Sequence, residues 1–442
     1  MKRSTLTAIG IAAAASLALA GCGGDSPPAE PDEPDTTMEA PEPVTLTMSG
    51  WSLNVTPEFR ALADGFHAEN PDVTVEIVEY ADGNDYDTQI IPDLAAGTAP
   101  DILVLKSLNK LWTFQSGGQL LDVSDVAAEL SDDVSGVDRY EIDGVTWAIP
   151  YRQDSWVLYY NKDLFDAAGV DYPDGTWTWD EYAAAAEVLT AGVSAQGAKG
   201  TYQHSWQSIV QSPALAQTPG ADLLSGDYGY LKPYYERALA MQNAGAQETY
   251  GTVTTSSLTY AAQFGTQKTA MLPMGSWYIA TILQQQASGE ADDFEWGIAP
   301  IPQFDDSTTG SDNVPVTWGD PTGAGINPAI DEAKLDAAKR FLAWLAGEGG
   351  ATVLAGLGVT PALSNDVVTD TFFALAGLPT DELSKWAFTT HDTRPENPVS
   401  AETATVQGIL NDAHSAIMSG SVAVDDAIAE AETRVASEAG IG

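Results

Sequence analysis

The chain has 442 residues, 44% of them hydrophobic, and a formal net charge of −45. This length exceeds that of one ordinary hydrophobic core, so two lobes are expected. The negative charge argues against a nucleic-acid binder, whose phosphate contacts need Lys and Arg, and against electrostatic docking on anionic lipid.

The amino-terminal residues have the pattern of a secretory signal. Lys2 and Arg3 make a basic start, and residues 9–20 form an apolar stretch too short to span a bilayer. Leu19-Ala20-Gly21-Cys22 follows and resembles the bacterial lipobox, in which the signal is cut before a cysteine that becomes acylated. We therefore expect residues 1–21 to be a lipoprotein signal peptide. The alternative is an ordinary secretory signal with a cysteine there by chance.

Residues 22–43 cannot build a core, because prolines and acidic side chains dominate them. Such a segment is expected to be a disordered tether with a reach of about 50–70 Å. It suits a protein held at the extracytoplasmic face of the cell membrane by a lipid on Cys22. No later stretch is apolar over the length that a membrane span needs.

From residue 44 onward, strand and helix patterns alternate. Strands are indicated by alternating or wholly apolar runs, and helices by apolar residues at helical spacing after capping residues. The order is strand 44–48, helix 56–70, strand 73–77, helix 86–96 and strand 102–105. This alternation predicts a parallel sheet with helices on its faces.

Residues 140–170 are interpreted as a passage from one lobe to the other. Asp143-Gly144 is a tight-turn dipeptide and predicts a hairpin. Pro150 cannot donate to a ladder, so it is predicted to mark the point at which the chain leaves the first sheet. Asp154 and Trp156 then lie at the crossing.

Beyond this crossing the chain is predicted to form the second lobe and to return. Thr178 and Glu181 have the spacing of a capping box, which predicts a helix start. Residues 191–229 show weak periodicity. Residues 358–361 look like another crossing between the lobes. The remaining predictions are strands at 156–160, 269–274, 296–301 and 314–327, and helices at 161–169, 178–189, 231–244, 257–264, 277–286, 335–345 and 422–438.

Several short motifs are informative through their order, although each alone is weak. They are Asn70-Pro71 before a Val-x-Val strand, Gly97-x-x-Pro100-Asp101-Ile102, Asp143-Gly144 with Pro150-Tyr151, Tyr160-Asn161-Lys162-Asp163, Trp177-x-Trp179-Asp180-Glu181, Gly275-Ser276-Trp277, Pro300-x-Pro302 and Gly358-x-x-Pro361. From Val44 to the C-terminus, this set resembles the extracellular solute-binding proteins of bacterial ABC importers, in the carbohydrate-binding group.

The resemblance implies a two-lobed α/β fold of the type II periplasmic-binding-protein kind, each lobe a mainly parallel sheet flanked by helices. Three hinge crossings join the lobes, so each lobe is discontinuous in sequence. The crossings are expected near 152–154, 301–316 and 361–366, with an N-terminal lobe at 44–152 plus 317–363 and a C-terminal lobe at 153–316 plus 364–442.

The resemblance also implies a function. The protein would capture a mono- or oligosaccharide by hinge closure and deliver it to the transmembrane subunits of an ABC permease, without a cofactor and without acting as an enzyme. We expect a monomer. One alternative is a lipid-anchored glycoside hydrolase, which needs two carboxylates about 5–10 Å apart. Others are a binding protein for a non-sugar solute and a sensor that serves a membrane receptor.

Candidate ligand residues follow from the chemistry of sugars, which offer polar edges and apolar C–H faces to hydrogen-bonding groups and aromatic rings. By resemblance, Trp277 matches the family's stacking position in Gly-x-Trp, and Asp154 matches an acidic ligand residue after the first hinge. The alternatives are a core tryptophan and an exposed loop acid. Further candidates are Trp51 at a strand end, Gln203, His204 and Trp206 in the aromatic-rich segment, Trp318 and Asp320 on the returning strand, Asn109 and Arg394.

A metal site is not expected. The four histidines His67, His204, His391 and His414 lie far apart in sequence, and the chain has a single cysteine. The acidic segment Asp82–Asp85 lacks the spacing of an EF-hand loop, so a solvated turn is expected there.

Overall fold

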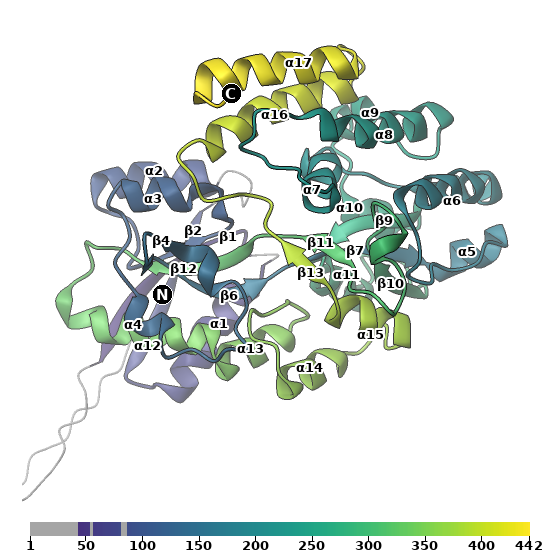
Figure 1. Ribbon diagram of the computed structural model, residues 1–442. Coiled ribbons are helices and arrows are strands. Elements are labelled where there is room, and N and C mark those ends of the chain that lie inside the picture. Colours follow the sequence, from purple (N-terminus) through teal and green to yellow (C-terminus); the bar gives the residue numbers. More distant parts are fainter. Residues whose placement is uncertain (1–42, 54–55, 81–85) are drawn as a thin grey trace, which may run out of the picture. The chain divides into compact units, whose positions relative to one another are not determined.

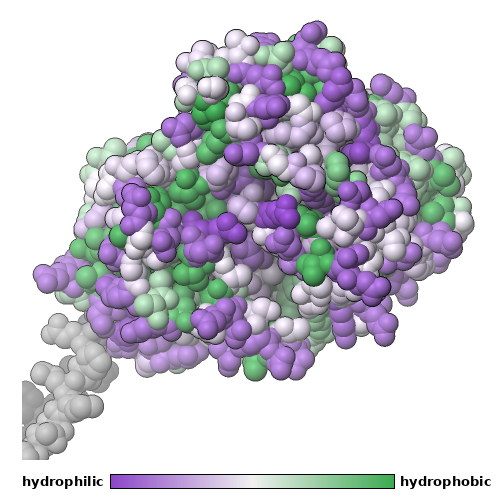
Figure 2. Space-filling model, viewed as in Figure 1, coloured by the Kyte–Doolittle hydropathy of each residue, from purple (hydrophilic) through white to green (hydrophobic). Residues whose placement is uncertain are grey.

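Three ranges of the chain, residues 43–53, 56–80 and 86–442, are described by a computed structural model (Figure 1). The predicted signal peptide 1–21, Cys22, the tether up to residue 42 and the Asp82–Asp85 turn lie outside these residues. Within them, no helix is both long and apolar enough to cross a membrane. Figure 2 shows hydrophilic side chains over much of the visible face, in keeping with the acidic composition.

A five-stranded sheet of order β2-β1-β3-β12-β6 organises the first lobe. Its first three strands are parallel, because helices α1 and α2 return the chain in the same direction each time. β12 and β6 run antiparallel to their neighbours. The elements are β1 Val44–Trp51, α1 Glu58–Glu69, β2 Val73–Tyr80, α2 Tyr86–Ala96, β3 Ile102–Leu105, α3 Leu111–Ser116, α4 Ser124–Ala127, β6 Ile149–Gln153, β12 Pro321–Ile326, α12 Leu335–Ala346 and α13 Glu348–Ala355.

A four-stranded sheet of order β10-β7-β9-β8 organises the second lobe. Its strands are β7 Trp156–Asn161, β8 Lys199–Thr201, β9 Thr269–Gly275 and β10 Trp296–Pro300, and a separate pair joins β11 Val316–Trp318 to β13 Asp392–Arg394. The helices are α5 Lys162–Ala168, α6 Trp179–Gly192, α7 Ser208–Gln217, α8 Lys232–Ala244, α9 Tyr250–Thr255, α10 Tyr260–Gly265, α11 Tyr278–Ser288, α14 Asp366–Phe373, α15 Glu382–Thr389, α16 Thr403–Met418 and α17 Val424–Arg434.

The two-lobed α/β fold is thus confirmed, but the strand directions differ from the expectation. In the second sheet β7 is antiparallel to both β9 and β10, and only β8 and β9 are parallel. Parallel neighbours need a crossover connection within one sheet, whereas β7 arrives directly from the other lobe. A mainly parallel arrangement therefore describes β2-β1-β3 and not the second sheet.

The first crossing between the sheets is Asp154-Ser155, because β6 ends at Gln153 and β7 begins at Trp156. The prediction that Pro150 marks this point is wrong. Pro150 lies inside β6, which is the edge strand of its sheet and pairs only with β12. At an edge, one side of the strand needs no ladder partner, so the missing N–H of proline is tolerated.

The second and third crossings lie beside the first. Gly319 follows β11, and a Cβ at this position would lie 2.2 Å from the carbonyl oxygen of Asp154, so the two backbones approach too closely for any side chain. The third crossing is held along β6, where the amide of Gln153 donates to the carbonyl oxygen of Thr360 at 3.1 Å.

Local sequence signals set several of these elements. Asp143 and Gly144 both have positive φ, 55° and 80°, and form the predicted hairpin between β4 Glu141–Ile142 and β5 Val145–Thr146. Thr178 and Glu181 make the predicted capping box at the start of α6. β8 and α7 have no predicted counterpart, since α7 buries glutamine and serine side chains that interrupt its apolar pattern.

Candidate functional site

The end of β9 carries the tryptophan singled out by sequence. Trp277 packs edge-on against Trp156, with ring centroids 5.5 Å apart at 86°, and lies 6.3 Å from Trp206. Its ring lies over Gly275, where a Cβ would come within 1.9 Å of Cζ3. Glycine at that position therefore allows the indole to lie against the strand end, half-buried, with the rest of its surface accessible.

Three further rings join Trp277 and form what we call the aromatic wall: His204, Trp206 and Tyr260. The imidazole of His204 lies 4.5 Å from Trp206 and 5.7 Å from Tyr260, and Trp206 lies 5.7 Å from Tyr260. All four members are partly exposed. His204 and Trp206 come from the segment after β8, and Tyr260 begins α10, so three separate segments of the second lobe build this wall.

The hydrogen-bond network defines the tautomer of His204. The Oη of Tyr202 donates to the carbonyl oxygen of Leu258 at 2.8 Å and also lies 2.9 Å from Nδ1 of His204. Because a carbonyl oxygen only accepts, the phenol proton goes to Leu258 and Nδ1 of His204 carries a hydrogen. Burial lowers the pKa of His204 to about 4. At neutral pH the ring is uncharged, and its Nε2 is a hydrogen-bond acceptor.

A buried ion-pair network lies at the first crossing. Arg152 bonds Oε1 of Glu58 through Nη1 and Oδ2 of Asp154 through Nε, both at 2.7 Å. Burial opposes the charge of Arg152, but the two carboxylates raise its pKa above the ordinary value. Burial also raises the pKa of Glu58, and Arg152 opposes this shift. The guanidinium is thus already neutralised by two acids.

Asp154 connects this network to the aromatic wall. Its Oδ1 accepts from the Oγ of Ser276 at 2.9 Å, and Ser276 in turn accepts from the Oγ1 of Thr360 at 2.8 Å. Ser276 directly precedes Trp277, and Thr360 belongs to the third crossing. Burial raises the pKa of Tyr260, and the charges of Arg152 and Asp154 act on it in opposite directions. Hydrogen bonds and ion pairs therefore connect the first and third crossings to the residue that precedes Trp277 of the wall.

The first lobe contributes Trp51 at the end of β1. The indole packs on Phe59 at 4.8 Å and on Tyr86 at 4.9 Å and is 9% exposed. The Nζ of Lys106, just after β3, lies 5.7 Å from its ring centroid. Trp51 is therefore largely a packing residue in this structure, with a cation placed over its ring.

Two other predicted ligand residues, Trp318 at the end of β11 and Asp320 between β11 and β12, are buried supports. Trp318 is 1% exposed and stacks on Trp156 at 5.5 Å and 26°. Asp320 is 8% exposed and accepts from the amides of Leu108, Glu396 and Asn397 and from the side-chain amide of Asn397. Neither presents an open surface next to the wall.

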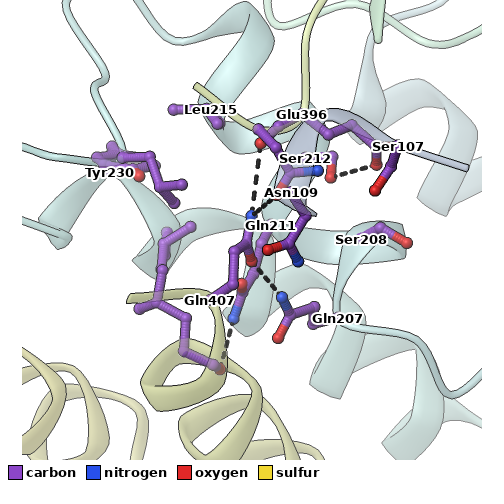
Figure 3. A pocket seen from close by; sticks show the side chains of 14 residues that line it. Ser107, Asn109, Gln207, Ser208, Gln211, Ser212, Leu215, Tyr230, Glu396 and Gln407 are labelled. Atoms are coloured by element: carbon purple, nitrogen blue, oxygen red, sulfur yellow. Dashed lines mark hydrogen bonds between the residues drawn. The ribbon is translucent and has the colours of Figure 1, made fainter. Parts of the chain in front are cut away.

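The remaining predicted residues are Gln203, Arg394 and Asn109, and none of them belongs to the aromatic wall. Gln203 is 8% exposed, and its Oε1 has no hydrogen-bond donor among the described residues. Arg394 is exposed, pairs with Asp392 and donates to the carbonyl oxygen of Ala216 at 2.6 Å. Asn109 lines a cavity of about 250 Å³ between α7 and α16 (Figure 3).

Several residues of the site were missed by sequence reasoning. Tyr260 lies in a predicted helix and in no motif, and Ser276 was read only as part of Gly-x-Trp. Glu58 is the first residue of α1 and belongs to none of the motifs singled out by sequence. The signal that could have pointed to this network was Arg152, one of 18 basic residues in an acidic chain, next to a hinge. Among the residues that the structure describes, no group of three or more His, Cys, Asp or Glu side chains could hold a metal ion.

Comparison with known proteins adds relatives of high structural similarity. A sugar transporter from Rhizobium etli, in an open conformation, is 33% identical over 89% of this chain and 99% of its own, with a TM-score of 0.77. A Listeria monocytogenes substrate-binding protein in complex with cycloalternan shares the fold at 19% identity, covering 91% of this chain and 100% of its own with a TM-score of 0.72.

Curated relatives match over shorter stretches. A putative binding protein of Brucella abortus is 24% identical over 268 residues, which cover 59% of this chain and 63% of that protein. The sn-glycerol-3-phosphate-binding periplasmic protein of Escherichia coli strain K12 is 32% identical over 185 residues, 39% of this chain and 40% of its own length. The family described as bacterial extracellular solute-binding protein matches residues 51–352. These matches are to binding proteins rather than enzymes, and the chain belongs to the bacterial extracellular solute-binding protein family.

Proposed function

We propose that this protein captures an uncharged sugar between its two lobes and delivers it to the permease of an ABC importer. The observation that carries the proposal is the aromatic wall. Its half-exposed rings fit the apolar faces of a sugar, and Nε2 of His204 can accept a hydrogen bond from a hydroxyl group. The description of the Rhizobium etli relative as a sugar transporter supports this ligand class.

A second candidate comes from the Escherichia coli relative, whose name states that it binds sn-glycerol 3-phosphate. A phosphate needs positive charge that is not already neutralised. Arg152, the cation closest to the wall in the hydrogen-bond network, is held between Glu58 and Asp154. This charge balance favours a neutral sugar over a phosphorylated ligand.

The crossings are the parts that move in this proposal. We assign residues 44–153 with 319–363 to the first lobe and 154–318 with 364–442 to the second. This keeps β11 with β13, its hydrogen-bonded partner, and places the second hinge at Gly319. Ligand contacts made by both lobes would favour the closed form.

The sugar proposal is tested by calorimetric titration of the full mature chain with monosaccharides, oligosaccharides and glycerol 3-phosphate. A ligand present at 100 times its Kd stabilises the protein by about 2.7 kcal/mol. Trp277→Ala should abolish measurable binding of any sugar found. Trp344→Ala, which removes a ring packed on Phe66 in the first lobe, should leave affinity unchanged. Binding of glycerol 3-phosphate but of no sugar overturns the proposal.

The lipid anchor at Cys22 is part of the same proposal and needs its own test. Growth of the producing bacterium with a labelled fatty acid should label the wild-type protein and not a Cys22→Ala variant. Loss of sugar uptake when the gene is deleted would support delivery to a permease, whereas unchanged uptake with a lost chemotactic or transcriptional response would support a sensor.

A further inference from the structure

A second cavity lies at the three crossings, and we call it the rear pocket. Its volume is about 390 Å³, compared with about 250 Å³ for the cavity of Figure 3. The first lobe lines it with residues between 135 and 139, with Pro321 and with residues 360–363, and the second lobe lines it with α14, the end of α15 and β13. Gln153 and Gly319 also line it, so all three crossings border this pocket.

Strand geometry places the rear pocket on the opposite face of the crossings from the buried ion pairs. Successive side chains of a strand point to opposite faces. Arg152 of β6 points toward the ion pairs, and the next side chain, Gln153, lines the rear pocket. The first crossing therefore separates the two.

The returning strands repeat this alternation. Pro321 lines the rear pocket, whereas Asp320 points to Asn397 at the cavity of Figure 3. Pro395 lines the rear pocket, whereas Glu396, whose pKa burial and the charge of Asp320 raise to about 8, lines the other cavity. In Figure 1, α14 and α15 accordingly lie below the crossings, and α7 and α16 lie above them. The two cavities have no lining residue in common, and no ring of the aromatic wall lines the rear pocket.

Much of the rear pocket's surface is apolar. Phe372 of α14 and Phe388 of α15 stack on each other, with ring centroids 4.2 Å apart at 17°. Leu363, Val368 and Pro321 add aliphatic surface. A flat apolar ring system would therefore meet apolar side chains of both lobes.

The charged groups among the described lining residues balance one another. Asp138 and Arg139 lie side by side at the exposed rim, with Oδ2 and Nε 3.6 Å apart. Nε2 of His391 donates to the carbonyl oxygen of Phe388 at 3.1 Å, so its Nδ1 accepts from the Oγ1 of Thr393 at 2.8 Å. Burial lowers the pKa of His391, and the ring is uncharged at neutral pH. This balance favours an uncharged occupant.

Gln153 supplies a hydrogen-bond acceptor to the rear pocket. Its side-chain nitrogen donates to the carbonyl oxygen of Asp154 at 2.9 Å and lies 3.5 Å from that of Gly319. These contacts turn Oε1 toward Gly136, where a Cβ would lie 3.3 Å from it. A hydroxyl or N–H group of an occupant can donate to this oxygen beside the first crossing.

The width of the rear pocket depends on the angle between the lobes, because both lobes line it. When the lobes rotate about the crossings and cover the aromatic wall, the sides of a pocket on the opposite face move apart. The rings of the wall are partly exposed in this structure. A rigid occupant that contacts both lobes at their present spacing therefore favours the conformation in which the wall is accessible, and it opposes closure.

We propose that the rear pocket is an effector site for an uncharged molecule with two fused aromatic rings and one hydrogen-bond donor, and that its occupation weakens ligand capture at the aromatic wall. Its volume lies in the range of about 300–1,000 Å³ that is usual for small-molecule sites. The site itself does not depend on what the wall binds, whereas the coupling rests on the proposed function.

The site is tested by calorimetric titration of the full mature chain with 2-naphthol, which has two fused rings and one hydroxyl group. It should bind at one site, and about tenfold or more tightly than the anion 2-naphthoate or the cation 2-naphthylmethylammonium, because an added charge loses its hydration without an unpaired counter-ion in the lining. Tighter binding of either ion overturns the proposed ligand class.

Variants of α14 locate the bound molecule. Thr369→Trp adds an indole to the lining and should abolish 2-naphthol binding. Thr371→Trp, on the same helix but outside the lining, is the matched control and should leave binding unchanged. Ser364→Trp, at an exposed lining position, replaces the first variant if thermal unfolding shows that Thr369→Trp does not fold. Unchanged 2-naphthol binding by a folded filling variant overturns the proposal.

The coupling is tested by titrating the sugar that binds the wild type with and without saturating 2-naphthol. The Kd of the sugar should rise about fivefold or more, and the sugar should raise the Kd of 2-naphthol by the same factor, because the coupling is reciprocal. An unchanged Kd of the sugar overturns the effector role. Absence of binding by every sugar refutes the proposed function instead, and the 2-naphthol titrations still decide whether the rear pocket is a binding site.

Discussion

Replacing Gly275 by alanine is expected to disable the aromatic wall without touching any of its rings. A Cβ at this position would lie 1.9 Å from Cζ3 and 2.2 Å from Cε3 of Trp277. Because ordinary contacts begin near 3.4 Å, the indole has to withdraw by about 1.5 Å. Trp277 is half-buried, so its ring can move outward and the strand need not unfold.

The size of the effect follows from the contacts that the ring gives up. Its pairs with Trp156 and Trp206 are worth about 0.5–1.5 kcal/mol each, so a site organised by both loses about 1–3 kcal/mol. That corresponds to a roughly 5- to 150-fold weaker Kd for the sugar. Calorimetric titration measures this change in Kd, and thermal unfolding shows whether the variant remains folded.

Gly408→Ala is the matched control. Gly408 lies in α16, is exposed, and a Cβ there meets nothing within 4 Å. The same substitution should leave affinity unchanged and stabilise the helix by about 0.5–1 kcal/mol. If Gly275→Ala folds and binds sugar as the wild type does, Trp277 is not organised by its contact with this strand end and the reasoning fails.

Three further predictions concern ionisable groups. Arg152→Met should lower the free energy of unfolding at pH 7 by about 3–5 kcal/mol, because it leaves Glu58 and Asp154 buried without a counter-ion. This loss of stability should shrink toward pH 4, because Glu58, whose pKa is raised, then takes up a proton. Urea titrations measure the loss at each pH, and a loss that is constant with pH contradicts this explanation. The ¹⁵N NMR spectrum of His204 should show a protonated Nδ1 and no titration above about pH 4, and a hydrogen on Nε2 instead would rule out the acceptor role. The pKa of Glu396 in the folded protein, about 8, lies above its ordinary 4.5, so its contribution to stability is complete below pH 4.5 and is lost as pH rises through 8. Glu396→Gln should therefore gain stability relative to the wild type between pH 5 and pH 9. Parallel pH profiles of stability for the two proteins would show that Glu396 is already ionised.

The sequence predicted the fold well wherever a short-range rule decides the local structure. The hairpin at Asp143-Gly144 and the helix start at Thr178 each depend on a few adjacent residues, and both are present. Pro150 was misread because its effect depends on whether its strand is central or at an edge, and strand order is a property of the whole sheet.

The site was predicted less completely, because the role of a side chain there depends on contacts with residues far away in the sequence. Aromatic content and motif order pointed to Trp277 and Trp206, and these do lie near each other. Whether Trp318 stacks on a ligand or supports the core depends on the ring packed against it, that of Trp156, which lies 162 positions earlier in the chain. The role of His204 depends likewise on a carbonyl group of Leu258, and no local pattern records that contact.

The run of indoles from Trp318 through Trp156 and Trp277 to Trp206 has a practical consequence. Successive ring centroids are separated by 5.5, 5.5 and 6.3 Å, so excitation energy absorbed by one indole passes readily along the row. Trp318 is buried, whereas Trp206 and Trp277 are partly exposed. We therefore expect a ligand that covers the exposed indoles to change the tryptophan emission of the whole row. Ligand binding should then be measurable by intrinsic fluorescence, without attaching a dye.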